Sequence, residues 1–155
     1  MQPTYGWFDL DKPCYKFTKM TRKRRLTLIS AIRGDKIIAN QIINGSANGE
    51  IFLDFIKSNI LDKYNNQAIL LDNARIHHTK ILKENVRNTT NKLVYNVPYN
   101  PETNPIELVF GPLKAHIKTT KKNNTIKEVT NIIKSHFKSI TRSTLKKYYR
   151  KSLNK

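Results

Sequence analysis

This sequence of 155 residues is 38% hydrophobic and carries a formal net charge of +18, from 29 Lys or Arg against 11 acidic residues. Its length and hydrophobic content suffice for one domain with a buried core and exclude a disordered chain. No run of apolar residues approaches the about 18 that a membrane span needs. The N-terminus lacks the basic-then-apolar pattern of a secretory signal. We therefore expect neither a membrane span nor secretion. The single cysteine, Cys14, cannot form an internal disulfide, so we expect a reducing compartment.

The excess of positive charge favours a polyanionic partner, of which nucleic acid is the commonest. From Lys114 to Lys155 the chain has thirteen Lys or Arg and one acid, Glu128. A ribosomal or otherwise soluble basic protein would have a similar composition, so the charge alone leaves that alternative open.

Short runs of β-branched and aromatic residues predict strands within residues 5–17, 26–32 and 36–43. Gly34-Asp35 predicts a two-residue hairpin turn between the last two, because glycine accepts a positive φ. A cluster of cations before this hairpin predicts either contacts with a nucleic-acid backbone or a solvated strand end. These cations are Lys19, Arg22, Lys23, Arg24 and Arg25.

The central part of the chain predicts alternating helices and strands. Asn48 is a typical helix cap, and apolar residues between 51 and 60 then fall on one helical face, with the helix ending between residues 61 and 64. The apolar run 67–71 predicts a buried strand that ends at Asp72. A helix over 78–87 and a strand over 92–97 follow.

Proline and hydrophobic spacing predict three C-terminal helices. The first begins at Pro105 or Ile106, since proline suits the first helical turn, and we expect a kink or break at Gly111-Pro112. An apolar stripe over 126–140 predicts the second, and a basic helix runs to the C-terminus. A hairpin followed by a β-α-β order predicts an α/β fold, with a mixed sheet flanked by helices.

Two acidic residues occupy positions that can carry chemistry. Asp72 follows a predicted buried strand, where α/β sheets place functional groups, although capping of the next turn explains it equally well. Glu107 lies in the first turn of a predicted helix, where a favourable interaction with the helix dipole is a sufficient explanation by itself. Pro98, Pro101 and Pro105 indicate a stiff approach to this helix.

Taken together, the segments Asp72-Asn-Ala-Arg-Ile-His77 and Pro98-Tyr-Asn-Pro-Glu-Thr-Asn-Pro-Ile-Glu107 resemble the second and third acidic motifs of mariner-type DDE transposases, or DDE superfamily endonucleases. Thirty-four residues separate the two acids, as in one branch of that superfamily. The resemblance runs from about Tyr5 to Lys118.

The resemblance implies a ribonuclease-H-like fold in which Asp72 and Glu107 are catalytic ligands of two Mg²⁺ or Mn²⁺ ions. Such ions prefer oxygen ligands, and a pair about 4 Å apart stabilises both the attacking and the leaving oxygen of phosphoryl transfer. Asn73 would orient Asp72 or contact a phosphate, and His77 would either support Asp72 or simply begin a helix. Besides the cluster before the hairpin, the expected contacts with DNA are Lys114, Lys118, Lys121 and Lys122.

In the family, the first acid lies on a central strand that precedes the segment resembled by Gly6-Trp7. Because the sequence starts five residues before Gly6, the resemblance implies that this strand and its Asp are missing. Asp9 and Asp11 are the nearest acids, and we do not expect either to substitute. We expect a partial catalytic domain over 1–118 and a basic helical extension over 119–155.

The predicted function is therefore a transposase-derived domain for DNA binding and strand transfer, incomplete or inactive by itself. The alternative is a non-enzymatic, basic nucleic-acid-binding remnant. The expected partners are DNA, as element ends and target, and either an upstream transposase fragment or a second copy. We expect the protein where DNA is accessible, in a nucleus or in a nucleoid and cytoplasm.

Overall fold

The structure, a computed structural model, describes residues 25–98, 100–120 and 125–153. The strands predicted within residues 5–17 lie outside these ranges. None of the described helices is long and apolar enough to cross a membrane. The elements are β1 (Leu26–Arg33), β2 (Lys36–Asn44), α1 (Gly49–Ile56), the π-helical turn η1 (Lys57–Leu61), β3 (Ala68–Leu71), the 3₁₀ turn η2 (Arg75–His78), α2 (Lys80–Arg87), β4 (Lys92–Tyr95), the 3₁₀ turn η3 (Pro101–Thr103), α3 (Pro105–Thr119), α4 (Ile126–Ser139) and α5 (Arg142–Leu153).

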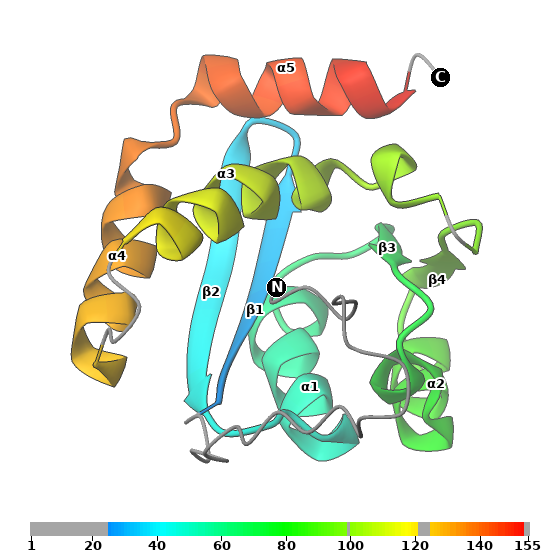
Figure 1. The fold of residues 1–155 in the computed structure, drawn as a ribbon. Helices are drawn as coiled ribbons and strands as arrows, with labels where there is room; N and C mark the ends of the chain where they lie inside the picture. The colour runs from blue at the N-terminus through cyan, green and yellow to red at the C-terminus, as the bar shows by residue number, and fades with distance from the viewer. Residues whose placement is uncertain (1–24, 99, 121–124, 154–155) are drawn as a thin grey trace, which may run out of the picture.

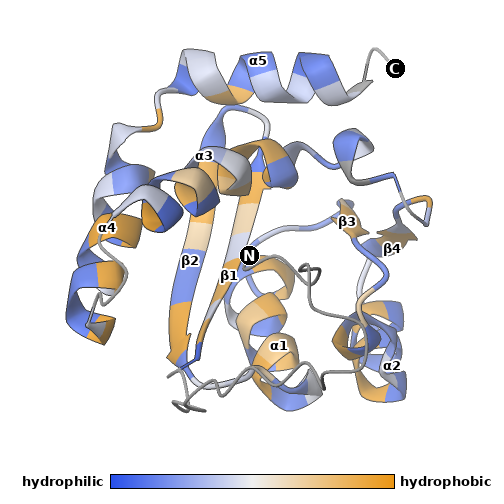
Figure 2. Cartoon of the chain, viewed as in Figure 1, coloured by the Kyte–Doolittle hydropathy of each residue, from blue (hydrophilic) through white to orange (hydrophobic). Residues whose placement is uncertain are grey.

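The predicted hairpin is confirmed. β1 and β2 pair antiparallel across the two-residue turn, where Gly34 has a φ of 58° that favours glycine. The alternation of side chains along β1 puts Ile29 in one hydrophobic core and Leu28 against a second. The hairpin is thus covered by helices on both faces (Figures 1 and 2).

The two cores share the hairpin but hold different helices. The first core packs α1, β3 and α2 together around fully buried Leu82, and the predicted cap of α1 is present, with Asn48 Oδ1 accepting from the N–H of Ile51 at 2.9 Å. The second core joins α3, α4 and α5. Its buried residues are Val109, Leu113, Ile133, Phe137 and Leu145.

The strands form two separate pairs. β3 lies parallel to β4, from Ala68 opposite Lys92 to Leu71 opposite Tyr95. Within the described ranges neither of these strands pairs with the hairpin, so the predicted mixed sheet is divided into an antiparallel and a parallel half. The two halves stand beside one another in Figure 1.

Of the predicted kink or break at Gly111-Pro112, a break does not occur, because α3 begins at Pro105 as predicted and continues to Thr119. Proline removes one helical hydrogen bond and crowds the preceding turn. Val109 and Leu113, which flank the pair, are 0% and 3% exposed. Their burial in the second core holds both halves of the helix in place against this local cost.

The start of α4 gives a test of local stability. Thr125 and Glu128 form a capping box: Thr125 Oγ1 accepts from the N–H of Glu128 at 3.2 Å, and Glu128 Oε2 accepts from the N–H of Thr125 at 2.7 Å. Thr125→Ala is expected to lower the free energy of unfolding by about 1 kcal/mol in urea denaturation at neutral pH. Thr130→Ala, farther along the same helix, should not destabilise, since Ala has the higher helix propensity.

The effect of Thr125→Ala should also depend on pH. Hydrogen bonds from the backbone and then the side chain of Thr125 lower the pKa of Glu128. A carboxyl group with a lowered folded-state pKa stabilises the protein above its unfolded pKa of about 4.3, and this contribution is lost as the pH falls through the folded-state pKa. The difference between Thr125→Ala and the parent should therefore shrink at acid pH. A constant difference would contradict the assigned role of Glu128.

Candidate functional site

Asp72 is the first residue after β3, whose buried side chains, Ile69 and Leu71, fix the end of the strand in the first core. Its Oδ1 accepts a hydrogen bond from the backbone N–H of Ala74 at 3.0 Å. The turn-capping contact thus exists, yet the side chain is still 51% exposed. Capping positions this carboxylate while leaving it accessible to a ligand.

His77 lies against Asp72. Its Nδ1 is 2.7 Å from Oδ1 of Asp72, and the imidazole is only 14% exposed. The ring packs on Phe52 with 4.2 Å between ring centroids. The hydroxyl of Tyr95, whose pKa is raised by burial, donates to the backbone carbonyl of His77 at 2.8 Å. Phe52 and Asp72 therefore contact the imidazole, while Tyr95 fixes the backbone of His77.

A chain of amide hydrogen bonds links the end of β3 to the start of α3. Asn73 Nδ2 donates to the backbone carbonyl of Asn96 at 2.6 Å, and Asn96 Nδ2 donates to that of Asn100 at 2.8 Å. The Thr103 hydroxyl donates to Oδ1 of Asn96 at 2.5 Å. Asn104, 6% exposed, caps α3 with its side chain. This chain sets the end of β3 and the start of α3 relative to one another.

Glu107 lies in the first turn of α3, as predicted. Its side chain is 32% exposed, and its Oε2 is 3.4 Å from Nζ of Lys114, two turns along the same helix. Lys114 is 64% exposed. Such an exposed pair contributes little to stability. The ammonium group of Lys114 can therefore leave Glu107 and pair with another anion.

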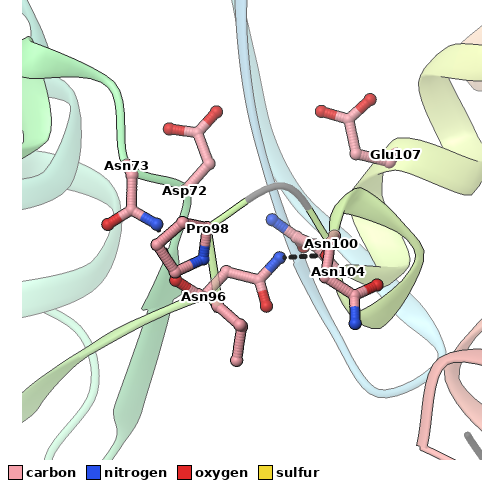
Figure 3. A pocket seen from close by; sticks show the side chains of 8 residues that line it. Asp72, Asn73, Asn96, Pro98, Asn100, Asn104 and Glu107 are labelled. Atoms are coloured by element: carbon pink, nitrogen blue, oxygen red, sulfur yellow. Dashed lines mark hydrogen bonds between the residues drawn. The ribbon is translucent and has the colours of Figure 1, made fainter.

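The two acids line one pocket of about 420 Å³. In Figure 3 their carboxylates lie on the same side of the pocket, above the asparagines that line its floor. Within the described ranges, no three His, Cys, Asp or Glu side chains are grouped so as to hold a metal ion. The pocket residues are Asp72, Asn73, Asn96, Val97, Pro98, Asn100, Asn104 and Glu107.

The predicted nucleic-acid contacts are only partly described. Arg25 is exposed and its guanidinium donates to Ser46 Oγ at 3.0 Å, while Lys114 and Lys118 are exposed on α3. Lys19, Arg22, Lys23, Arg24, Lys121 and Lys122 lie outside the described residues. Further exposed cations on α5 were not predicted as contacts; they are Arg142, Lys146, Lys147, Arg150 and Lys151.

The prediction also missed the structural role of the asparagines. Asn96, Asn100 and Asn104 recur every four residues between the end of β4 and the start of α3. Amide side chains offer both a donor and an acceptor, so they can satisfy the backbone groups of an irregular segment. Their density next to three prolines was the signal that could have indicated a rigid, hydrogen-bonded connection.

Residues 1–144 match the sequence profile of the DDE superfamily endonuclease family. No match was found among curated protein sequences.

Solved structures of the Mos1 transposase are similar in fold. The Mos1 strand transfer complex has a TM-score of 0.71 at 12% identity, covering 97% of this chain and 46% of that one. The Mos1 paired-end complex with left transposon end gives 0.71 at 13% identity, over 97% and 47%. The Mos1 catalytic domain with Raltegravir and Mn gives 0.72 at 10% identity, over 84% and 72%. The chain spans about half the length of the first two structures. The similarity in fold confirms the predicted ribonuclease-H-like α/β fold.

Proposed function

The chain belongs to the DDE superfamily endonucleases, and from this we propose that its Asp72–Glu107 pocket is derived from the phosphoryl-transfer site of a cut-and-paste DNA transposase. The observation that carries the proposal is that these two acids, predicted from separate motifs, line the same pocket. Packing gives no reason for two accessible carboxylates to share one opening.

The donor set of the pocket fits Mg²⁺ or Mn²⁺. Both are oxygen-seeking ions, and Mg²⁺ in particular keeps several waters and takes only one or two protein carboxylates. Asp72 and Glu107 would hold the metal, which supplies Lewis-acid stabilisation of the charge that develops during phosphoryl transfer. The Mos1 catalytic domain has been solved with Mn. With two acids in the described part of the pocket, we expect its ligand set to need a further carboxylate.

The surrounding residues have distinct tasks in this proposal. His77 and the N–H of Ala74 hold the Asp72 carboxylate on the pocket side. Asn73 ties the turn after Asp72 to the end of β4. Lys114, near Glu107, can turn its ammonium toward a phosphate that enters the pocket.

For the substrate we propose DNA, namely element ends and a target, with the protein acting in a nucleus or nucleoid where DNA is accessible. The net charge of +18 and exposed Lys114, next to Glu107 of the pocket, support this substrate class. Solved structures of the Mos1 transposase include a strand transfer complex and a paired-end complex with the left transposon end.

Salt titration tests the DNA proposal. Affinity for a DNA duplex should fall linearly on a log–log plot against salt, with a slope of about −0.9 for each neutralised phosphate. Lys118→Ala should reduce the magnitude of this slope by about 1. Lys83→Ala, on α2 of the first core, is the matched control and should leave the slope unchanged. A slope near zero for the parent would rule out the cationic surface as the DNA contact.

A plasmid-nicking assay tests the state of the site. The purified chain with Mg²⁺ is expected to leave supercoiled DNA intact, because its two described acids make an incomplete ligand set. If the purified chain nicks DNA efficiently and Asp72→Asn abolishes the nicking, the ligand set is not incomplete. That result would still support phosphoryl transfer at this pocket. If Asp72→Asn binds DNA as the parent does, and Mn²⁺ changes the DNA binding of neither protein, the alternative of a non-enzymatic nucleic-acid binder is favoured.

A further inference from the structure

The last helix, α5, has a cationic face whose residues do not line the acid pocket. On the packed side of the helix, Leu145 and Ser152 are 2% and 4% exposed, and Tyr148 contacts the second core. The Tyr149 hydroxyl donates to the backbone carbonyl of Ile32 at 3.1 Å. These contacts fix the rotation of the helix about its axis, and its other side carries five exposed cations. They are Arg142, Lys146, Lys147, Arg150 and Lys151.

The uniform charge of this face does not help the helix to form. Like charges four positions apart repel, as at Lys147 and Lys151. The helix contains no acidic residue, so no charge within α5 offsets the repulsion. In α2, by comparison, Glu84 follows Lys80 by four positions. A face that only has to be solvated is more stable with both signs of charge, so the single sign on α5 favours a polyanionic ligand.

The cations of α5 are accessible to such a ligand. Lys146 is 63% exposed and lies 3.8 Å from a carboxylate oxygen of Asp35, which makes a long, exposed pair that contributes little to stability. Among the described residues, the other four cations of the helix take part in no ion pair. The positive charges of the face can therefore pair with an external anion without breaking contacts that hold the fold.

The remaining side chains of α5 favour duplex DNA over a single strand. Sites for single strands stack bases on aromatic side chains, but both tyrosines of α5 are engaged on its packed side. Contacts with the phosphates of a duplex need only cations within reach. At 1.5 Å for each residue, the 12 residues of α5 span about 18 Å, the axial length of about five base pairs.

We propose that the exposed face of α5 binds the sugar–phosphate backbone of duplex DNA, over about five base pairs and without reading their sequence. α5 contacts η3 as well as α3, and η3 lies between Asn100 and Asn104 of the acid pocket. In Figure 1 the C-terminal end of α5 is the end that lies near this turn. The helix would thus position a duplex next to the pocket wall. The positioning step rests on the proposed function, whereas binding by α5 rests on its own charge and packing.

Two double variants with the same loss of charge test the face. Lys147→Ala combined with Lys151→Ala should reduce the magnitude of the log–log salt slope for duplex binding by about 2, since each lost phosphate contact removes about 1. Lys127→Ala combined with Lys134→Ala, which removes two exposed cations of α4, is the matched control and should leave the slope unchanged. Equal changes in both double variants would mean that net charge alone attracts DNA, and the proposal would fail.

Stability gives a second measurement on the same α5 double variant. Alanine has the highest helix propensity, and the two substitutions relieve repulsion between like charges. Urea denaturation should therefore give an unfolding midpoint no lower than that of the parent, while the salt slope falls. A lower midpoint would mean that the lysines pack the helix rather than face a ligand, which contradicts the assigned surface.

The form of the DNA distinguishes backbone contact from other modes of binding. Duplexes rich in A·T and in G·C should show the same reduction in slope when the two lysines are replaced, because phosphates carry no sequence information. A reduction confined to one sequence would indicate base readout. A larger reduction for a single strand than for a duplex of the same length would indicate a single-strand site. Either result would exclude the proposed contact.

A paramagnetic probe separates this inference from the proposed function. Mn²⁺ held by Asp72 and Glu107 should broaden the phosphorus NMR signals of a bound duplex more in the parent than in Asp72→Asn, which controls for Mn²⁺ bound directly to DNA. The α5 double variant should lose this additional broadening. If Mn²⁺ occupies the pocket without it, α5 does not position the duplex there. If Mn²⁺ does not bind the pocket but the α5 variant still lowers the salt slope, the proposed function fails and the DNA-binding face stands.

Discussion

Asp72→Asn is expected to remove specific Mn²⁺ binding, measured by calorimetry or by the electron paramagnetic resonance of free Mn²⁺. Removing a residue that only hydrogen-bonds to a metal ligand lowers metal affinity about 10–100-fold. Removing a ligand itself should therefore lower Mn²⁺ affinity at least about 100-fold. Asn retains an oxygen that can accept from the N–H of Ala74. The fold should therefore survive, and the loss can be assigned to the missing charge.

Two comparisons control this result. Glu107→Gln should have an effect similar to Asp72→Asn, because both carboxylates line the pocket. Asp62→Asn removes one exposed carboxylate at the end of η1, outside the pocket, and should leave Mn²⁺ binding intact. If Asp72→Asn binds Mn²⁺ as tightly as Asp62→Asn, the pocket is not a metal site.

Leu82→Ala is expected to cost ~2–5 kcal/mol of stability, the range for a buried leucine truncated in a core that cannot collapse around it. Leu82 is 0% exposed, in α2 at the centre of the first core. Against a typical total stability of about 5–15 kcal/mol, this is a large fraction. Chemical denaturation monitored by circular dichroism measures the change.

The neighbouring residue supplies the matched control. Ile81 lies next to Leu82 on α2 but is 47% exposed, so Ile81→Ala should change stability by well under 1 kcal/mol. Equal losses for the two variants would mean that α2 is not packed as described. A loss for Leu82→Ala below about 1 kcal/mol would have the same meaning.

Local signals in the sequence predicted the elements well. Gly34 marked the hairpin turn, Asn48 marked the cap of α1, and Pro105 marked the start of α3. Each of these residues acts through contacts within a few positions of itself, which a sequence pattern records directly. The continuation of α3 through Pro112 has a different cause. There, burial of Val109 and Leu113 by distant helices outweighs a local preference.

The candidate site was only partly accessible from the sequence. Strand-end and helix-start positions indicated Asp72 and Glu107 one by one, and the family resemblance suggested that they belong together. The amide chain through Asn96 and Asn100 depends on backbone carbonyls that a sequence does not place. The division of the strands into two pairs likewise depends on which edges meet in space.

The two acids are attached to different halves of the molecule. Asp72 follows a strand of the first core, whereas Glu107 begins a helix of the second. The pocket is therefore lined by residues attached to both cores, which are themselves joined through the shared hairpin of β1 and β2. A cation bound by both carboxylates would add a second link between the cores, from the end of β3 to the start of α3, and the strength of that link would depend on metal concentration.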